Sequence, residues 1–195
     1  MSRFVSTQLY PAFAVLLALT ILVGAVYPAL VTLVAQIAFP SQANGSFITT
    51  NDGRTIGSGL IGQNFSEDTY FWSRPSAAGD GYDANASAAS NLAPTSQALI
   101  DRVAEAVDRY QSIHGDGPVP VDLVTASASG LDPHISPAAA EYQVERVAEA
   151  RDISADEVRA AVARNTDQPF LGFLGQPSVN VLLLNLDLDG LLQAG

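Results

Sequence analysis

The sequence contains no cysteine, no lysine and only two histidines. Without cysteine the chain can form neither a disulfide nor a thiolate site, so packing alone must hold the fold together. Without lysine it lacks the side chain with which a P-loop contacts the β- and γ-phosphates of ATP. Two histidines without cysteine also make a poor zinc ligand set. These absences exclude thiol catalysis and ATP hydrolysis by a P-loop, and they make a zinc site at His134 a weak hypothesis.

Charge is missing from a long stretch near the N-terminus. Apart from tyrosines, no ionisable side chain lies between Arg3 and Asp52, and residues 11–34 are almost wholly apolar. About 20 such residues span a bilayer as a helix, whereas the apolar region of a signal peptide is only about 7–15 residues long. We therefore predict a retained membrane anchor at residues 1–40, with a span at about 11–34 and a domain at 41–195, although Ser41-Gln42-Ala43 could pass as a cleavage site.

The orientation of the anchor rests on Arg3 and the free amino terminus. The positive-inside rule then places the N-terminus in the cytoplasm and residues 41–195 outside, which predicts a single-pass protein of the cell membrane with an extracytoplasmic domain. Small residues recur on one face of the expected helix, at Ala14, Ala18, Ala25 and Ala29, where a partner helix could approach closely. A lone anchor in which alanine is merely common explains the same pattern.

The domain beyond the span is strongly acidic. The chain carries a formal net charge of −11, and eight arginines oppose twenty acidic residues after the span. Such a domain repels nucleic acid and anionic lipid, and it could modestly enrich cations nearby. The same composition is equally expected as a solubility feature.

Periodicity predicts a mixture of strands and helices in the domain. Two short strands are expected about an Asn51-Asp52-Gly53 turn, followed by a long irregular loop from Tyr70 to Pro94. Helices are predicted over Thr95–His114, after a Ser136 N-cap, and after Ser154, where Glu157 would complete a capping box. The run "SVNVLLLNLDL" at 178–188 reads as a buried strand. This order predicts an α+β fold, with α/β as the alternative.

Two motif fragments lack their structural context. Gly57 to Gly62 matches the dinucleotide fingerprint GxGxxG, but no clean helical period follows, so a turn after a strand is favoured. Asn185 to Gly190 imitates the opening of an EF-hand loop without its bidentate glutamate. Neither fragment predicts a ligand.

The segment "TASASGLDPHIS" at 125–136 gathers Ser127, Ser129, Asp132 and His134. A Ser-His-Asp hydrolase needs its serine on a sharp strand-to-helix turn, with the other two residues arriving from other segments. Here the first glycine of GxSxG is missing and Asp132 lies two residues from His134. We therefore favour a rigid turn that leads into the Ser136 N-cap, and keep a membrane-anchored serine hydrolase as an alternative.

Six segments carry a resemblance to a known family. In order they read "YPALVTLVAQIAFPSQANGS", "GSGLIGQNF", "YFWSRPSAAG", "SNLAPTSQALIDRV", "VPVDLVTASASGLDPHISPAAAEYQVERVAEAR" and "LGFLGQPSVNVLLLNLDL". Together they resemble KdpC, the C subunit of the Kdp potassium-transporting P-type ATPase. The resemblance covers nearly the whole chain. It implies a single-span membrane protein in a complex with KdpA, KdpB and KdpF.

The resemblance also implies a function. It describes a non-catalytic accessory subunit, needed for assembly, that acts as a catalytic chaperone and raises the ATP affinity of KdpB. ATP is thus implied as a ligand. An outer domain, however, faces a compartment without ATP, so we expect no tightly bound cofactor. We expect any effect on the ATP affinity of KdpB to be transmitted through the membrane helix. Where the family commonly has a Ser-Gly-Gly-Ser-Asn stretch, this chain reads Ser87-Ala88-Ala89-Ser90-Asn91, which argues against a phosphate-binding loop. An anchored solute-binding module is a further alternative.

The motifs of this resemblance suggest an interface or structural role for a set of residues, while no catalytic residue and no metal ligand is assigned. The set is Gly62, Gln63, Arg74, Pro75, Asn91, Ser127, Ser129, Asp132, His134 and Asn180.

Overall fold

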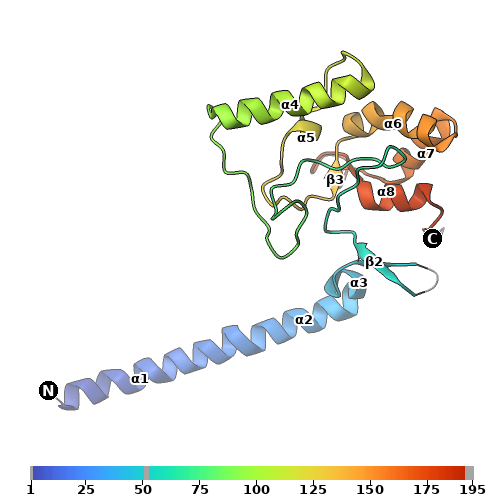
Figure 1. Cartoon of the computed structure of the whole chain (residues 1–195). Coiled ribbons are helices and arrows are strands. Elements are labelled where there is room, and N and C mark those ends of the chain that lie inside the picture. The colour runs from blue at the N-terminus through green and yellow to red at the C-terminus, as the bar shows by residue number, and fades with distance from the viewer. Residues whose placement is uncertain (1, 51–52, 192–195) are drawn as a thin grey trace. The chain divides into compact units, whose positions relative to one another are not determined.

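The computed structural model describes residues 2–50 and 53–191, and it divides into two compact units (Figure 1). The first unit is Met1–Phe47 and the second is Ile48–Gly195. The predicted turn residues Asn51 and Asp52 lie outside the described residues. The two units differ in where their apolar side chains lie. The first is a helix with exposed apolar side chains, and the second has a buried hydrophobic core.

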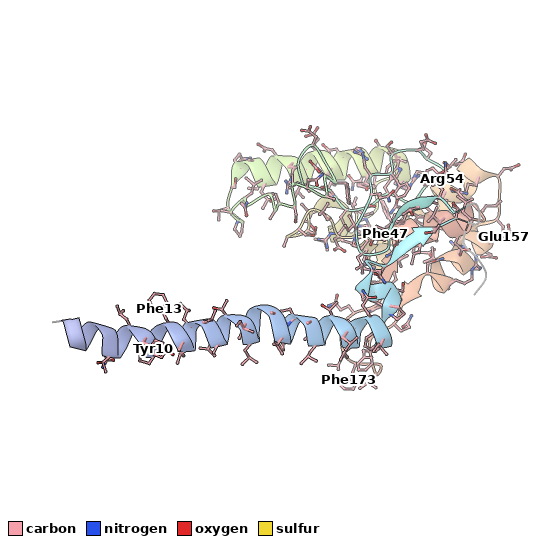
Figure 2. The ribbon with its side chains drawn as sticks, turned by 90° about the horizontal axis from the view of Figure 1, so that it is seen from below. Tyr10, Phe13, Phe47, Arg54, Glu157 and Phe173 are labelled. Atoms are coloured by element: carbon pink, nitrogen blue, oxygen red, sulfur yellow. The ribbon has the colours of Figure 1, made fainter. Side chains whose placement is uncertain are left out.

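The N-terminal unit is a nearly continuous helix. It consists of α1 (Ser2–Ile21), a π-helical turn η1 (Leu22–Val26) and α2 (Tyr27–Ala38), followed by the short α3 (Pro40–Ala43). Within the described residues one helix is long and apolar enough to cross a membrane, Thr7–Ala38, with 32 residues, a mean hydropathy of 2.4 and none of the tested window buried. Figure 2 shows Tyr10 and Phe13 projecting outward from this ribbon. The helix contains the predicted span and extends beyond it at both ends.

The π-helical turn lies directly before Pro28. Proline has no amide proton, and its ring would collide with the carbonyl four residues earlier, which is that of Gly24. The wider turn relieves this collision, and the amide of Tyr27 donates to the carbonyl of Leu22, five residues back. The helix therefore passes Pro28 without a break, and Ala25 falls within the widened turn.

Within the described residues the second unit contains two small sheets, the first of which begins at Phe47, the last residue of the first unit. β1 (Phe47–Thr49) pairs with β2 (Thr55–Ser58), which confirms the two short strands, and no helix or strand lies between Ser58 and Gln97, which confirms the long loop. β3 (His134–Ile135), β5 (Ser178–Asn180) and β4 (Thr166–Asp167) form an antiparallel sheet in that order, with His134 opposite Asn180 and Thr166 opposite Val179. Antiparallel pairing with separate helices fits an α+β arrangement rather than α/β.

Five helices complete the described part of this unit (Figure 1): α4 (Gln97–His114), α5 (Val121–Val124), α6 (Pro137–Arg151), α7 (Ala155–Arg164) and α8 (Val181–Leu188). The predicted caps are present. Ser136 accepts a hydrogen bond from the amide of Ala139, and Ser154 forms the full capping box with Glu157. α6 packs against α7, α4, α5 and β5, and it carries the completely buried Val144 and Val147.

The prediction of one long buried strand over 178–188 is wrong. The strand β5 stops at Asn180, whose side chain accepts a hydrogen bond from the amide of Leu183 and caps helix α8. Periodicity cannot separate a fully buried helix from a buried strand in a short apolar run. The cap residue was the missing signal, because asparagine at that position favours a helix start.

Candidate functional site

Four segments distant in sequence meet at Asp132, and we call this the Asp132 junction. It comprises residues 59–63, 73–82 and 125–136 together with Asn180. The amide of Gly62 donates to the carbonyl of Leu131 at 2.9 Å, and the Asn180 side chain donates to the carbonyl of Gly59 at 2.8 Å. Loops without regular structure are thus held by specific hydrogen bonds.

Asp132 is the charged centre of the junction. Its carboxylate pairs with the Arg74 guanidinium at 3.0 Å and accepts the amide of His134 at 3.0 Å, while its oxygen lies 3.5 Å from His134 Nδ1. Hydrogen bonding from His134, aided by the Arg74 charge and opposed by partial burial, lowers the pKa of Asp132 below its ordinary value. Arg74 also donates to the carbonyl of Thr125.

Gly62 is required by close packing. A Cβ at this position would lie 2.6 Å from a ring carbon of Tyr82 and 2.7 Å from the carbonyl oxygen of Asp132. Tyr82 is itself held because its hydroxyl donates to the carbonyl of Arg74, and burial raises the pKa of Tyr82 to about 12. The glycine of the GxGxxG match therefore serves the approach of two loops and not a nucleotide.

Ser127 and Ser129 hold the turn. Ser127 Oγ accepts the amide of Gly130 at 2.9 Å, and Ser129 Oγ accepts the amide of Leu131 at 3.1 Å. Gly130 has φ of 68°, and a Cβ there would lie 2.7 Å from the amide nitrogen of Ala78. In the part of the chain that the structure describes, no hydrogen bond joins either serine to His134. The geometry suits a fixed loop better than a nucleophile.

Several hollows border the junction, among them two of similar volume. One, of about 360 Å³, is lined by Trp72, Arg74, Tyr82, Arg102, Arg109 and Tyr110, with Pro75 and Glu105 also at its wall. The other, of about 370 Å³, is lined by Arg74, Asp122, Asp132, His134 and Ser178. Among residues 2–50 and 53–191 no group of three or more His, Cys, Asp or Glu side chains could hold a metal ion.

Comparison with known proteins decides the family. A family model described as "KdpC: K+-transporting ATPase, c chain" matches residues 9–190. The chain belongs to the KdpC family. It is 57% identical over 186 residues to a potassium-transporting ATPase KdpC subunit of Sorangium cellulosum, covering 94% of this chain and 97% of the relative. Another KdpC subunit, from Koribacter versatilis, is 55% identical over 171 residues and covers 88% of each chain.

The structure brings most of the residues suggested by the KdpC resemblance to one place. Gly62, Arg74, Ser127, Ser129, Asp132, His134 and Asn180 all belong to the junction, and Gln63 joins it because its carbonyl accepts the hydroxyl of Ser73 at 3.0 Å. Asn91 lies apart, exposed and with φ of 52°. The motif residues are therefore mainly the ones that fix this loop cluster.

Two donors of the loop at 87–91 bond to the domain itself. The amide of Ala88 donates to the carbonyl of Ser129 at 3.0 Å, and Ser87 Oγ donates to the same carbonyl at 2.9 Å. A phosphate-binding loop aims several unpaired backbone amides at its ligand. These two donors instead hold the loop on the Ser127–Ser129 turn.

Three buried polar residues that sequence reasoning missed hold the segment Tyr70–Trp72. Asn185 bonds both the amide and the carbonyl of Phe71, at 2.8 and 3.0 Å, and Gln143 bonds those of Trp72 at 2.8 and 3.2 Å. Arg146 donates to Gln143 and stacks over the Trp72 ring, 3.9 Å from its centroid. The signal was present, because Gln143 and Arg146 lie among the alanines and valines that α6 buries.

Proposed function

We propose that this chain is a non-catalytic accessory subunit of an ATP-driven potassium import complex. The observation that carries this proposal is the pairing of an exposed apolar helix, Thr7–Ala38, with a domain in which Asn185, Gln143, Ser127 and the Arg74–Asp132 pair all bond within the domain itself. Membership of the KdpC family supports the potassium-transporting ATPase as the assembly. Such a subunit acts by contact with its partners.

The proposed partners are the membrane subunits KdpA, KdpB and KdpF. The helix supplies one contact through its small residues. Ala14 and Ala18 share a face before the π-helical turn, while Ala25 and Ala29 share a face that the wider turn rotates away from the first pair. Either pair allows another helix to approach closely. All four are exposed in this chain, so they are available to a partner within the membrane. The small residues support close packing there because van der Waals contact drives helix association in lipid.

We place the N-terminus in the cytoplasm and the second unit outside the cell membrane. Arg3 before the span and the acidic composition after it support this orientation. An outer domain does not meet ATP, and the Ser87 hydroxyl and the Ala88 amide are already bonded to the carbonyl of Ser129, which supports an absence of direct nucleotide contact at these two donors. Any effect on the ATP affinity of KdpB is then a coupling free energy transmitted through the membrane helix.

Reconstitution with and without this chain tests the proposal. The complete complex should hydrolyse ATP in response to potassium and reach half of its maximal rate at a lower ATP concentration than the complex that lacks this subunit. The purified chain alone should neither hydrolyse ATP nor bind it measurably. Equal ATP dependence in both preparations would contradict the chaperone role. Direct ATP binding by the isolated chain would contradict coupling through the helix.

A further inference from the structure

A second strongly apolar surface lies in the domain itself, at the turn Phe170–Leu174. Its four large apolar side chains are 70% (Phe170), 70% (Leu171), 72% (Phe173) and 52% (Leu174) exposed. In Figure 2 the side chain of Phe173 lies well away from helix α4 of the same unit. Single exposed apolar residues are ordinary, but four within five consecutive residues mark an interaction surface.

The backbone of this turn is closed on itself. The amides of Phe170 and Leu174 donate to each other's carbonyls at 2.9 and 3.0 Å, the amide of Gly172 donates to the carbonyl of Pro169 at 2.9 Å, and that of Phe173 donates to Phe170 at 3.3 Å. Leu171 adopts φ of 55° and Gly172 φ of 81°, so the turn is held in a form that presents its side chains outward. A segment that leaves water for lipid needs such internal hydrogen bonds, because hydrocarbon cannot bond its backbone amides.

The turn is also free of charge within a strongly acidic domain. No ionisable side chain occurs between Asp167 and Asp187. Charged groups are depleted where a protein surface meets hydrocarbon, and phenylalanine and leucine are the side chains that such surfaces bury. The acidic remainder of the domain would be repelled by an anionic surface, so this turn is suited to a neutral, apolar one.

The chain itself keeps this turn close to a bilayer. Nine residues separate the end of α2 at Ala38 from the start of the second unit at Ile48, and nine extended residues span at most about 32 Å. A domain of this size has a radius of gyration of about 15 Å. Any face of the domain therefore lies within reach of the membrane in which the helix is inserted.

We propose that the Phe170–Leu174 turn inserts into the interfacial layer of the lipid bilayer and forms a second membrane contact of the chain. The inference rests on the proposed membrane anchoring and not on potassium transport. Insertion places the two phenylalanines and two leucines against acyl chains. The contact would limit the rotation of the domain about its anchor.

Fluorescence of single cysteines tests this directly, because the natural chain has none. The full chain carrying Phe173→Cys, labelled with an environment-sensitive dye, is placed in phosphatidylcholine vesicles that contain spin-labelled lipid. Val121→Cys is the matched control, since Val121 is apolar and 70% exposed but has no such cluster around it. Leu171→Cys gives a second position in the turn, and Val23→Cys reports insertion of the anchor.

We expect blue-shifted emission and quenching by shallow spin labels at positions 171 and 173, and neither at position 121. Emission at both turn positions equal to that at 121 would overturn the proposal. Blue-shifted emission that appears only when the other Kdp subunits are present, and that spin-labelled lipid does not quench, would also overturn it, because the turn would then dock on protein. Loss of quenching at Val23 would instead refute the anchor on which the inference rests.

Discussion

At the scale of single residues, Gly62 decides whether two loops can meet. We predict that Gly62→Ala destabilises the domain by about 1–3 kcal/mol, because its Cβ would overlap the Tyr82 ring and the Asp132 carbonyl. Gly117→Ala is the control, since a Cβ at Gly117 meets nothing within 4 Å and the change should stay within about 1 kcal/mol. Urea unfolding of the detergent-solubilised chain measures both. Equal effects would show that the close approach at Gly62 is not limiting.

Asp132 gives a pH-dependent prediction. Its pKa is lowered in the folded state, so its stabilising contribution is complete above the ordinary carboxyl value of 3.8 and is lost as the pH falls through the folded-state pKa. Asp132→Asn should therefore reduce the free energy of unfolding by about 1–3 kcal/mol near neutral pH, and much less in acid. Exposed Asp108→Asn is the control. A difference from the natural chain that does not shrink in acid would contradict the Arg74 and His134 pairing.

Local chemistry of this kind was partly predictable. Ser136 and Ser154 act as caps because the donor amides lie three residues along the same helix, so sequence alone contains the whole interaction. The interpretation of Ser127 and Ser129 as residues that fix a turn is supported for the same reason, because each hydroxyl accepts an amide two or three residues along the chain. Gly62 was suggested only through the family resemblance, since its neighbours Tyr82 and Asp132 are far along the chain and no periodicity reports such contacts.

At the scale of elements, the segment Tyr70–Trp72 is held by side-chain amides and not by pairing with a strand. We predict that Gln143→Ala costs about 2–4 kcal/mol, because it leaves the amide and carbonyl of Trp72 buried without partners and removes an acceptor of Arg146. Gln97→Ala on exposed α4, where the side chain bonds only Asp101, should change stability by less than about 0.5 kcal/mol. Chemical unfolding compares them. Similar losses would mean that the amide contacts of Gln143 contribute little.

The elements show where sequence reasoning reaches its limit. Helices with a capped start, such as α6 and α7, were predicted to begin where they do, after Ser136 and Ser154. The run after Asn180 was misassigned because a helix buried on all sides has no polar face to reveal its period. The small sheet β3-β5-β4 was also beyond prediction, since its strands of two or three residues gain stability only from nonlocal pairing.

At the scale of the whole molecule, the small-residue face of the helix carries a prediction about assembly. Ala18→Leu should reduce the amount of KdpB recovered with the tagged chain, because the larger side chain would separate the helices. Ala12→Leu is the matched control, since a separation of six residues puts it on a different face of the helix from Ala18. The yield after detergent extraction measures both. Equal yields would count against the proposed face.

The apolar helix and the mixture of helices and strands were accessible from sequence because they depend on composition and periodicity. An uncharged apolar run predicted the helix, and mixed periodicity predicted helices and strands in the residues that follow it. The Asp132 junction was not accessible in this way, because it is assembled from loops whose only common feature is where the fold places them. The exposed turn at Phe170–Leu174 was missed since apolar residues in a sequence are ordinarily assigned to a core.

The central claim is that this chain works as a membrane-bound partner and not as an independent enzyme. Copurification tests it most directly. The tagged full-length chain is extracted from membranes in mild detergent and the proteins that accompany it are identified. The account predicts KdpA and KdpB in stable association with the chain. Recovery of the chain alone from membranes that contain both subunits, or its recovery from the soluble fraction, would contradict the account.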